Sequence, residues 1–236
     1  MSFLAVGIRF LAGAIVLLWL LEPGAAQIRK IDNVSLENLI DASKVAVATL
    51  DKIGQPISDE DKKRLAEAWE MSGDQAKGRI QEILDRYALL EIRIDEEAWL
   101  KAYVASVDPA VRPLTQGKWK AFLVKVYNES PVKASINVRS PQTLSPEELK
   151  DAEAGIMKEA AAPYDWYRWL GLQIYPDAIT PQKFVSSTVS YLVLGIFSRD
   201  EGVRAADLEF YFGGGAVSQG HYVNKRLLFE IEPANE

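Results

Sequence analysis

The sequence predicts an α+β protein in which a small N-terminal three-helix unit precedes an antiparallel, Ig-like β-sandwich with an inserted helix. Two observations lead to this class. Up to about residue 89, apolar residues recur at a spacing of three or four, which is typical of amphipathic helices. From about residue 90, apolar and polar residues alternate in several short segments, which is typical of strands. We therefore expect a helical subdomain over 27–89 and a sandwich domain over 90–236.

Three short helices are expected in the first part. Ser35 can cap the start of the first helix, and Gly54 suits a left-handed cap at its end. Ser58 and Asp61 mark the start of the second helix, and a third is expected from about residue 74 to residue 90. Each helix carries only a narrow apolar stripe, so we expect the three to pack against one another or against the next part.

Seven strand segments are expected in the second part, at about residues 90–95, 97–107, 118–128, 133–140, 184–197, 203–212 and 222–232. The fifth and sixth are expected to form a hairpin, because turn residues at 198–202 separate two alternating runs. Between the fourth and fifth, Ser145, Pro146 and Glu148 have the residue types of the N-cap, N1 and N3 positions. They predict an inserted helix over about 146–162.

The first 26 residues have the composition of a secretory signal peptide. Arg9 precedes a continuous apolar run at 10–21, and the small residues at 24–26 suit a cleavage site after Ala26. The alternative is an uncleaved anchor, because residues 3–21 come close to the ~20 residues that a membrane-spanning helix needs. Either way, we expect the rest of the chain outside the cytoplasm, periplasmic or secreted.

The overall composition narrows the class of partner. The net charge is −6 without a basic cluster, which argues against nucleic acid. The chain has no cysteine, so disulfides, thiol nucleophiles and zinc–thiolate sites are excluded. We expect contact with a membrane only through an uncleaved N-terminal segment.

The most conspicuous motif combines three glycines at 213–215 with His221, the single histidine of the chain. A phosphate-binding loop would lead into a helix, whereas a strand is expected here. His221 lacks both the nucleophile elbow of a hydrolase and further histidine ligands. The acidic runs at 58–61 and 95–97 are expected at a helix start and a strand end. We therefore predict no catalytic, cofactor-binding or metal-binding residue.

An aromatic segment is the best candidate for a binding surface. Its members are Tyr164, Trp166, Tyr167, Trp169 and Tyr175. Such side chains can stack on sugar rings or anchor a protein interface. The alternative is that they fill the edge of the sandwich core, where large aromatic residues usually lie.

Three stretches, at 47–69, 117–130 and 165–215, resemble the region that precedes the catalytic domain in exported bacterial CehA/McbA-family metallohydrolases, which have a PHP-like hydrolase domain and are frequent in planctomycetes. The resemblance spans about residues 40–231. It implies a non-catalytic accessory region, because the histidines and carboxylates that hold the metals in that family have no counterparts here.

We therefore expect an exported, non-catalytic interaction module that positions or stabilises a protein partner: a fused or separate hydrolase domain, or another envelope protein. Two alternatives stay open. One is a carbohydrate-binding module that holds a glycan on the aromatic residues at 164–175. The other is a part of a metal-dependent hydrolase whose catalytic domain is missing from this chain.

Overall fold

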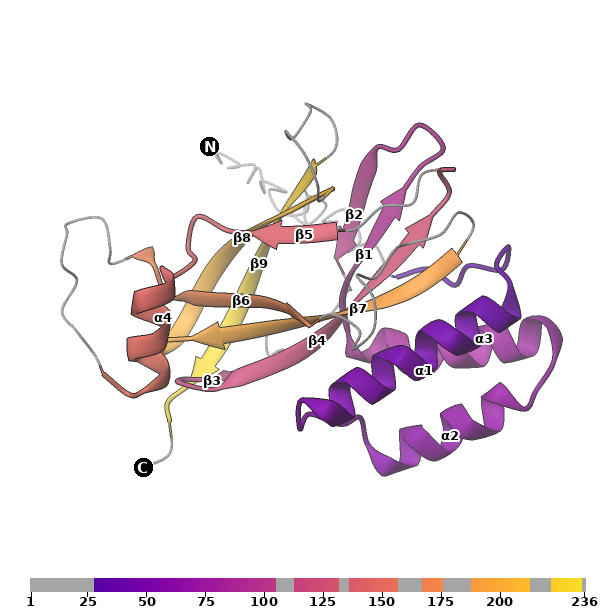
Figure 1. Cartoon of the computed structure of the whole chain (residues 1–236), viewed down its shortest axis with the longest axis horizontal. Coiled ribbons are helices and arrows are strands. Elements are labelled where there is room, and N and C mark those ends of the chain that lie inside the picture. The colour runs from indigo at the N-terminus through magenta and orange to yellow at the C-terminus, as the bar shows by residue number, and fades with distance from the viewer. Residues whose placement is uncertain are drawn as a thin grey trace, which may run out of the picture.

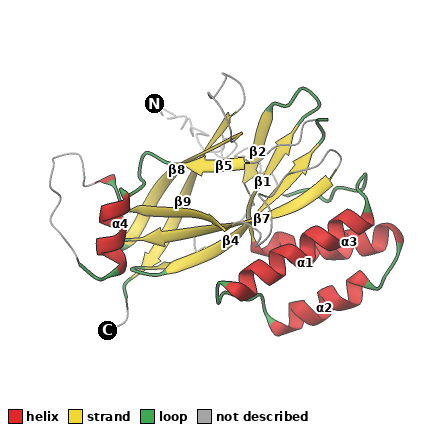
Figure 2. Ribbon diagram, viewed as in Figure 1, coloured by secondary structure: helices red, strands yellow, loops and turns green. Residues whose placement is uncertain are grey.

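The computed structural model describes residues 28–104, 113–131, 136–156, 167–175, 188–212 and 222–234. These residues form four α-helices, one 3-10 turn and nine strands in two sheets (Figure 1). Figure 2 shows that the helices lie at the periphery and the strands at the centre of the molecule. The expected α+β class is confirmed. The predicted export segment lies outside the described residues.

The first part of the chain forms three α-helices and one 3-10 turn: α1 (Leu36–Lys52), α2 (Asp59–Trp69), α3 (Gly73–Leu84) and η1 (Asp85–Tyr87). The Ser35 and Ser58 hydroxyls accept hydrogen bonds from backbone amides three residues later, as their capping role predicts. Gly54 has a φ of 74° directly after α1, which is the left-handed conformation expected there.

The strands form two sheets, called sheet A and sheet B. Sheet A has the order β2 (Leu100–Val104), β1 (Ala88–Ile94), β4 (Trp119–Asn128), β7 (Thr188–Ser198) and β6 (Leu170–Tyr175). Sheet B has the order β3 (Leu114–Thr115), β9 (Tyr222–Glu232), β8 (Gly202–Phe212) and β5 (Ile136–Arg139).

Both sheets are mixed, whereas the sequence predicted purely antiparallel pairing. β1 pairs with β4 in parallel, and β3 pairs with β9 in parallel. The reason in sheet A is that β2 returns along the outer edge of β1, so the chain reaches β4 from the end at which β1 began. The Ig-like form of the sandwich is therefore not confirmed.

The predicted hairpin around residues 198–202 is wrong. β7 pairs with β4 and β6 in sheet A, whereas β8 pairs with β9 and β5 in sheet B. The turn thus carries the chain from one sheet to the other. The physical reason is that β7 is buried along almost its whole length, and both of its edges are already occupied. Alternating strands on either side of a turn fit a hairpin and a crossing between packed sheets equally well.

The two sheets pack face to face, and the helices cover the opposite face of sheet A. The core between the sheets includes Ile92, Val124 and Leu194 from sheet A and Phe210 and Phe229 from sheet B. On the other face, one hydrophobic cluster joins side chains of α1–α3 to β4 and β7. The predicted boundary between residues 89 and 90 falls inside β1. The helical layer also shares a hydrophobic cluster with sheet A.

The inserted helix is α4 (Pro146–Glu153). The Glu148 amide donates to the Ser145 hydroxyl and the Ser145 amide donates to the Glu148 carboxylate, so the predicted capping box is confirmed. The helix ends at Glu153 rather than near 162, because Gly155 adopts a φ of 72° that ends the helical turn. α4 lies at the opposite end of the sheets from α1–α3 and packs near Phe197 (Figure 1).

Candidate functional site

The predicted aromatic surface is divided by sheet A. Tyr164 and Trp166 lie outside the described residues. Trp169 is only 3% exposed and lies in the core between the sheets, where its ring meets the Phe229 ring edge-on at 6.3 Å. Trp169 therefore joins sheet A to sheet B and is not available to stack on a ligand.

Tyr175 lies on the opposite face of sheet A, where its ring rests on the backbone of Gly195. A Cβ atom at Gly195 would lie 2.6 Å from Cε2 of Tyr175, so the absence of a side chain makes room for the ring. Burial raises the pKa of Tyr175, and the nearby Glu153 adds to this effect. Tyr167 is half-buried. The described members of the aromatic segment do not form one surface.

The glycine-rich segment connects neighbouring strands of sheet B. The three glycines at 213–215 and His221 lie outside the described residues, but β8 and β9 pair antiparallel on either side of them. The expected role of this segment as a link between two strands is confirmed.

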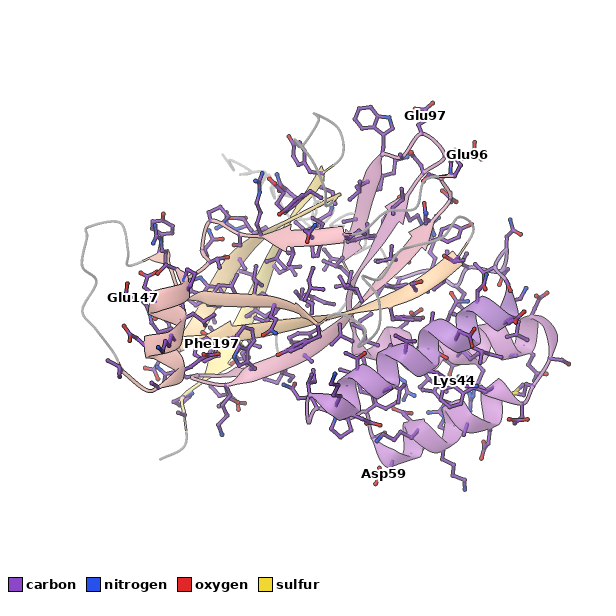
Figure 3. All side chains as sticks on the ribbon, in the orientation of Figure 1. Lys44, Asp59, Glu96, Glu97, Glu147 and Phe197 are labelled. Atoms are coloured by element: carbon purple, nitrogen blue, oxygen red, sulfur yellow. The ribbon has the colours of Figure 1, made fainter. Side chains whose placement is uncertain are left out.

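The acidic residues that Figure 3 labels lie on three separate parts of the molecule. Figure 3 shows Asp59 at the outer side of α2, Glu96 and Glu97 at the tip of the turn between β1 and β2, and Glu147 on α4. Among the residues that the structure describes, there is no group of three or more Asp, Glu or His side chains that could hold a metal ion. In the same ranges, no helix is long and apolar enough to cross a membrane.

The outer face of sheet B is the most exposed sheet surface in the described ranges. The residues opposite one another on β8 and β9 share this face in five pairs: Val203 with Glu230, Ala205 with Leu228, Asp207 with Arg226, Glu209 with Asn224, and Tyr211 with Tyr222. Val203 is 64% exposed, Leu228 47% and Tyr222 43%. We call these ten residues the outer face.

The outer face has an apolar end, a charged middle and an aromatic end. Val203 and Leu228 are diagonal neighbours at the apolar end. In the middle, the Arg226 guanidinium lies 3.8 Å from the Asp207 carboxylate. Arg139 of β5 pairs with Glu209 and lies over the Tyr211 ring at the aromatic end. This combination of apolar, charged and tyrosine side chains is typical of protein-binding surfaces.

The sequence analysis did not single out the outer face, although a signal for it exists. Leu227 and Leu228 are adjacent in a strand, so one of the two side chains has to face away from the core. The structure places Leu227 inside and Leu228 outside. An outward-facing leucine next to an outward-facing valine on the neighbouring strand is therefore the signal that indicates an exposed apolar surface.

A second unexpected feature is a group of buried charges on the helix side of sheet A. Lys125 is fully buried, and its ammonium donates to the Asp85 carboxylate at 2.8 Å. Burial raises the pKa of Asp85 and lowers that of Lys125, and their mutual attraction opposes both shifts. Glu91 is 1% exposed and accepts a hydrogen bond from Arg93 at 2.7 Å. Alternation in the sequence marks these residues as sharing a face but does not show that helices cover it.

Two hollows lie beside the helices. One, of about 630 Å³, runs between α2, α3 and the segment that precedes α1. Its cations already converge on Glu82, with Lys30 at 3.6 Å and Arg79 at 3.5 Å. The other, of about 330 Å³, lies between the loop after α1 and β4, where the Gln55 side-chain amide pairs with the β4 backbone. In both hollows, these polar groups already pair with one another or with the backbone.

Comparison with models of known protein families found no match, and comparison with curated proteins found no significant relative. The resemblance to the N-terminal region of CehA/McbA-family metallohydrolases stays a prediction.

Proposed function

We propose that this chain is an exported, non-catalytic interaction module that docks a protein partner on the outer face of sheet B. The partner is a hydrolase domain, fused or separate, or another protein of the bacterial envelope. The observation that carries the proposal is the pair of apolar side chains, Val203 and Leu228, which are exposed together on a regular and otherwise well-packed sheet.

The contrast between the two sheets supports this choice. The central strands of sheet A are buried on both faces, by sheet B on one side and by helices on the other. β9 instead alternates between buried and exposed residues, because nothing in the described ranges packs against its outward side. A regular sheet face with an apolar end can bury area against a partner without any rearrangement of the module.

Charges on the outer face support a protein partner over a lipid or a bare apolar ligand. Asp207 and Arg226 place both signs of charge next to the apolar end, and Glu209 and Arg139 of β5 place both signs next to the aromatic end. Mixed charges at the rim of an apolar patch orient an incoming protein and exclude mismatched ones. The carbohydrate-binding alternative has less support, because Trp169 lies in the core.

We further infer that the three helices and the two sheets act as one scaffold for this face. The cluster shared by α1–α3, β4 and β7 argues against a separately moving helical subdomain. If the chain belongs to a longer metal-dependent hydrolase, the same face is our candidate for contact with the catalytic domain.

Site-specific photo-crosslinking in the native envelope tests the proposal. A photoreactive residue at Leu228 is expected to form a discrete adduct, whereas the same residue at the exposed Lys63 of α2 forms none. Val203→Glu is expected to remove the adduct at position 228 and to change the unfolding free energy by no more than about 0.5 kcal/mol. Equal crosslinking at both positions, or none at position 228, would contradict the docking face.

A further inference from the structure

The segment before α1 is bound to the rest of the molecule by side chains. We call residues 28–34 the N-terminal strap. The Arg29 amide donates to the Glu91 carboxylate at 3.1 Å, and the Arg29 carbonyl accepts from the Lys125 ammonium at 2.8 Å. At Ile31 the amide donates to the Gln81 side chain at 2.8 Å, and the carbonyl accepts from it at 2.9 Å. Four main-chain groups of the strap are thus recognised by three side chains.

These three side chains are unusual for their burial. Gln81 and Lys125 are fully buried, and Glu91 is 1% exposed. They come from α3, β1 and β4; α3 and β1 are separated only by η1, whereas β4 follows later in the chain. A buried amide, ammonium or carboxylate is costly unless its hydrogen bonds are made, so each of these groups needs a main-chain partner beside it.

Other residues hold the recognising groups in place. Arg93 donates to one oxygen of Glu91 at 2.7 Å, which leaves the other oxygen toward the strap. Asp85 holds the Lys125 ammonium at 2.8 Å, and Tyr191 in turn donates to Asp85 at 2.9 Å. A groove whose polar groups are positioned without help from its occupant is preorganised for binding.

The strap adds two buried apolar side chains, a third that is partly buried (Ile28), and no strand pairing. Ile31 and Val34, three residues apart, are each 7% exposed and belong to the cluster under the helices. The strap contains no strand, so side chains and not a ladder hold its backbone. This resembles the way a protein holds a bound peptide, with main-chain groups supplying affinity and spaced side chains supplying specificity.

We propose that the groove formed by Gln81, Glu91 and Lys125 is a binding site for a peptide with apolar side chains three residues apart, and that the strap is its ligand in cis. The strap opens without global unfolding, and the groove then accepts an equivalent segment in trans. This site lies on the helix side of sheet A. The proposed docking face lies on sheet B, so either proposal can fail alone.

A fluorescent, acetylated peptide of residues 28–35 is the probe, used with the full chain. In the wild-type protein the strap competes with the peptide for the groove. The apparent affinity of the peptide is therefore its affinity for the open groove multiplied by the fraction of molecules in which the strap is open. The variant Ile31→Asp/Val34→Asp weakens the strap and leaves the groove intact, so it is expected to bind the peptide at least tenfold more tightly than wild type. Adding the isosteric Gln81→Glu removes the donor to the peptide carbonyl and is expected to reduce that affinity about tenfold.

Two results would overturn the proposal. One is a strap variant that stays folded by circular dichroism and binds the peptide no better than wild type. The other comes from hydrogen exchange in wild type, which does not depend on any variant folding. The Arg29 and Ile31 amides are expected to exchange at least tenfold faster than the Leu123 amide in the centre of β4. Exchange at the same rate as Leu123 would show that the strap opens only when the whole protein unfolds.

Discussion

At the scale of single residues, the largest departure from an ordinary core is the buried pair of Lys125 and Asp85. Lys125 has a hydrogen bond to a carboxylate and another to a main-chain carbonyl. Asp85 also accepts from Tyr191, whose pKa burial raises well above its ordinary value. The pair is therefore neutralised and largely hydrogen-bonded, which is the condition under which buried charges are tolerated.

Because the two charges compensate each other, removing one of them is expected to lower the unfolding free energy more than removing both. Lys125→Met leaves Asp85 without its cation and is expected to lower the unfolding free energy by about 3–5 kcal/mol. Lys125→Met combined with Asp85→Leu is expected to recover at least about 1 kcal/mol of that loss. Urea unfolding measures both, with Arg139→Met on β5, where the side chain is exposed, as a control that changes stability by less than about 1 kcal/mol. Equal effects of Lys125→Met and Arg139→Met would contradict this account.

At the scale of secondary-structure elements, Asp61 joins the start of α2 to η1. Its carboxylate accepts from the Tyr87 hydroxyl at 2.6 Å and pairs with Arg86. Its amide donates to Ser58, the residue that caps α2. Burial by itself would raise the pKa of Asp61, but the hydrogen bonds from Tyr87 and Arg86 outweigh it and hold the pKa below its ordinary value.

This lowered pKa predicts a dependence of stability on pH. Because Asp61 binds its proton more weakly in the folded state, its contribution is complete above the ordinary pKa of about 4 and is lost as the pH falls through the lower folded pKa. Asp61→Asn is expected to reduce the unfolding free energy at pH 7 by about 1 kcal/mol and to flatten its fall below pH 4. Urea unfolding from pH 2 to pH 7 measures this, with Asp59→Asn as the control. An unchanged acid limb in Asp61→Asn would count against it.

At the scale of the whole molecule, three layers are held together by sheet A. Its inner face packs on sheet B, and its other face packs on α1–α3 at one end and on α4 at the other. Trp169 lies where the chain enters β6 and contacts Phe229 of β9, so one side chain joins the two sheets. Among the residues that the structure describes, the outward side of β9 is exposed, and it belongs to the face that we propose for a partner.

Because Trp169 lies between the sheets, we predict that its substitution lowers the stability of the protein and does not remove a ligand-binding residue. Trp169→Ala is expected to lower the unfolding free energy by about 3–5 kcal/mol, because it leaves a large cavity between the sheets. Trp99→Ala is a matched control, since that ring is 47% exposed, and is expected to cost less than about 1 kcal/mol. Thermal unfolding of the two variants measures the difference. Similar effects of the two substitutions would show that Trp169 does not bridge the sheets.

Local features of the fold were predictable from the sequence to a large extent. The caps at Ser35, Ser58 and Ser145 were expected from residues within one helical turn, and all three are confirmed. Alternation along β8 puts Leu208 and Phe210 on one side of that strand and alternation along β9 puts Phe229 with Leu227 and Ile231, and all five are buried in the core. These features depend on residues close in the chain, so the sequence contains the information they need.

Pairing between distant segments was not predictable in the same way. The turn at 198–202 looked like a hairpin, and the sequence left open whether Trp169 lies on a binding surface or in the core. Their positions depend on which strand occupies each edge of β7 and on which residues lie across the core. Neither the candidate docking face nor the strap groove is marked by a local motif, because both are assembled from several elements.

By itself, the sequence determined the α+β class, the helix starts and the inward-facing residues of the strands. It did so because capping and periodicity are properties of short stretches of chain. Only the tertiary structure decided that the sheets are mixed, that Glu91 and Lys125 are buried around a strap, and that Leu228 faces outward. Burial is a property of what packs on a face, and the elements that cover sheet A come from segments dozens of residues away along the chain.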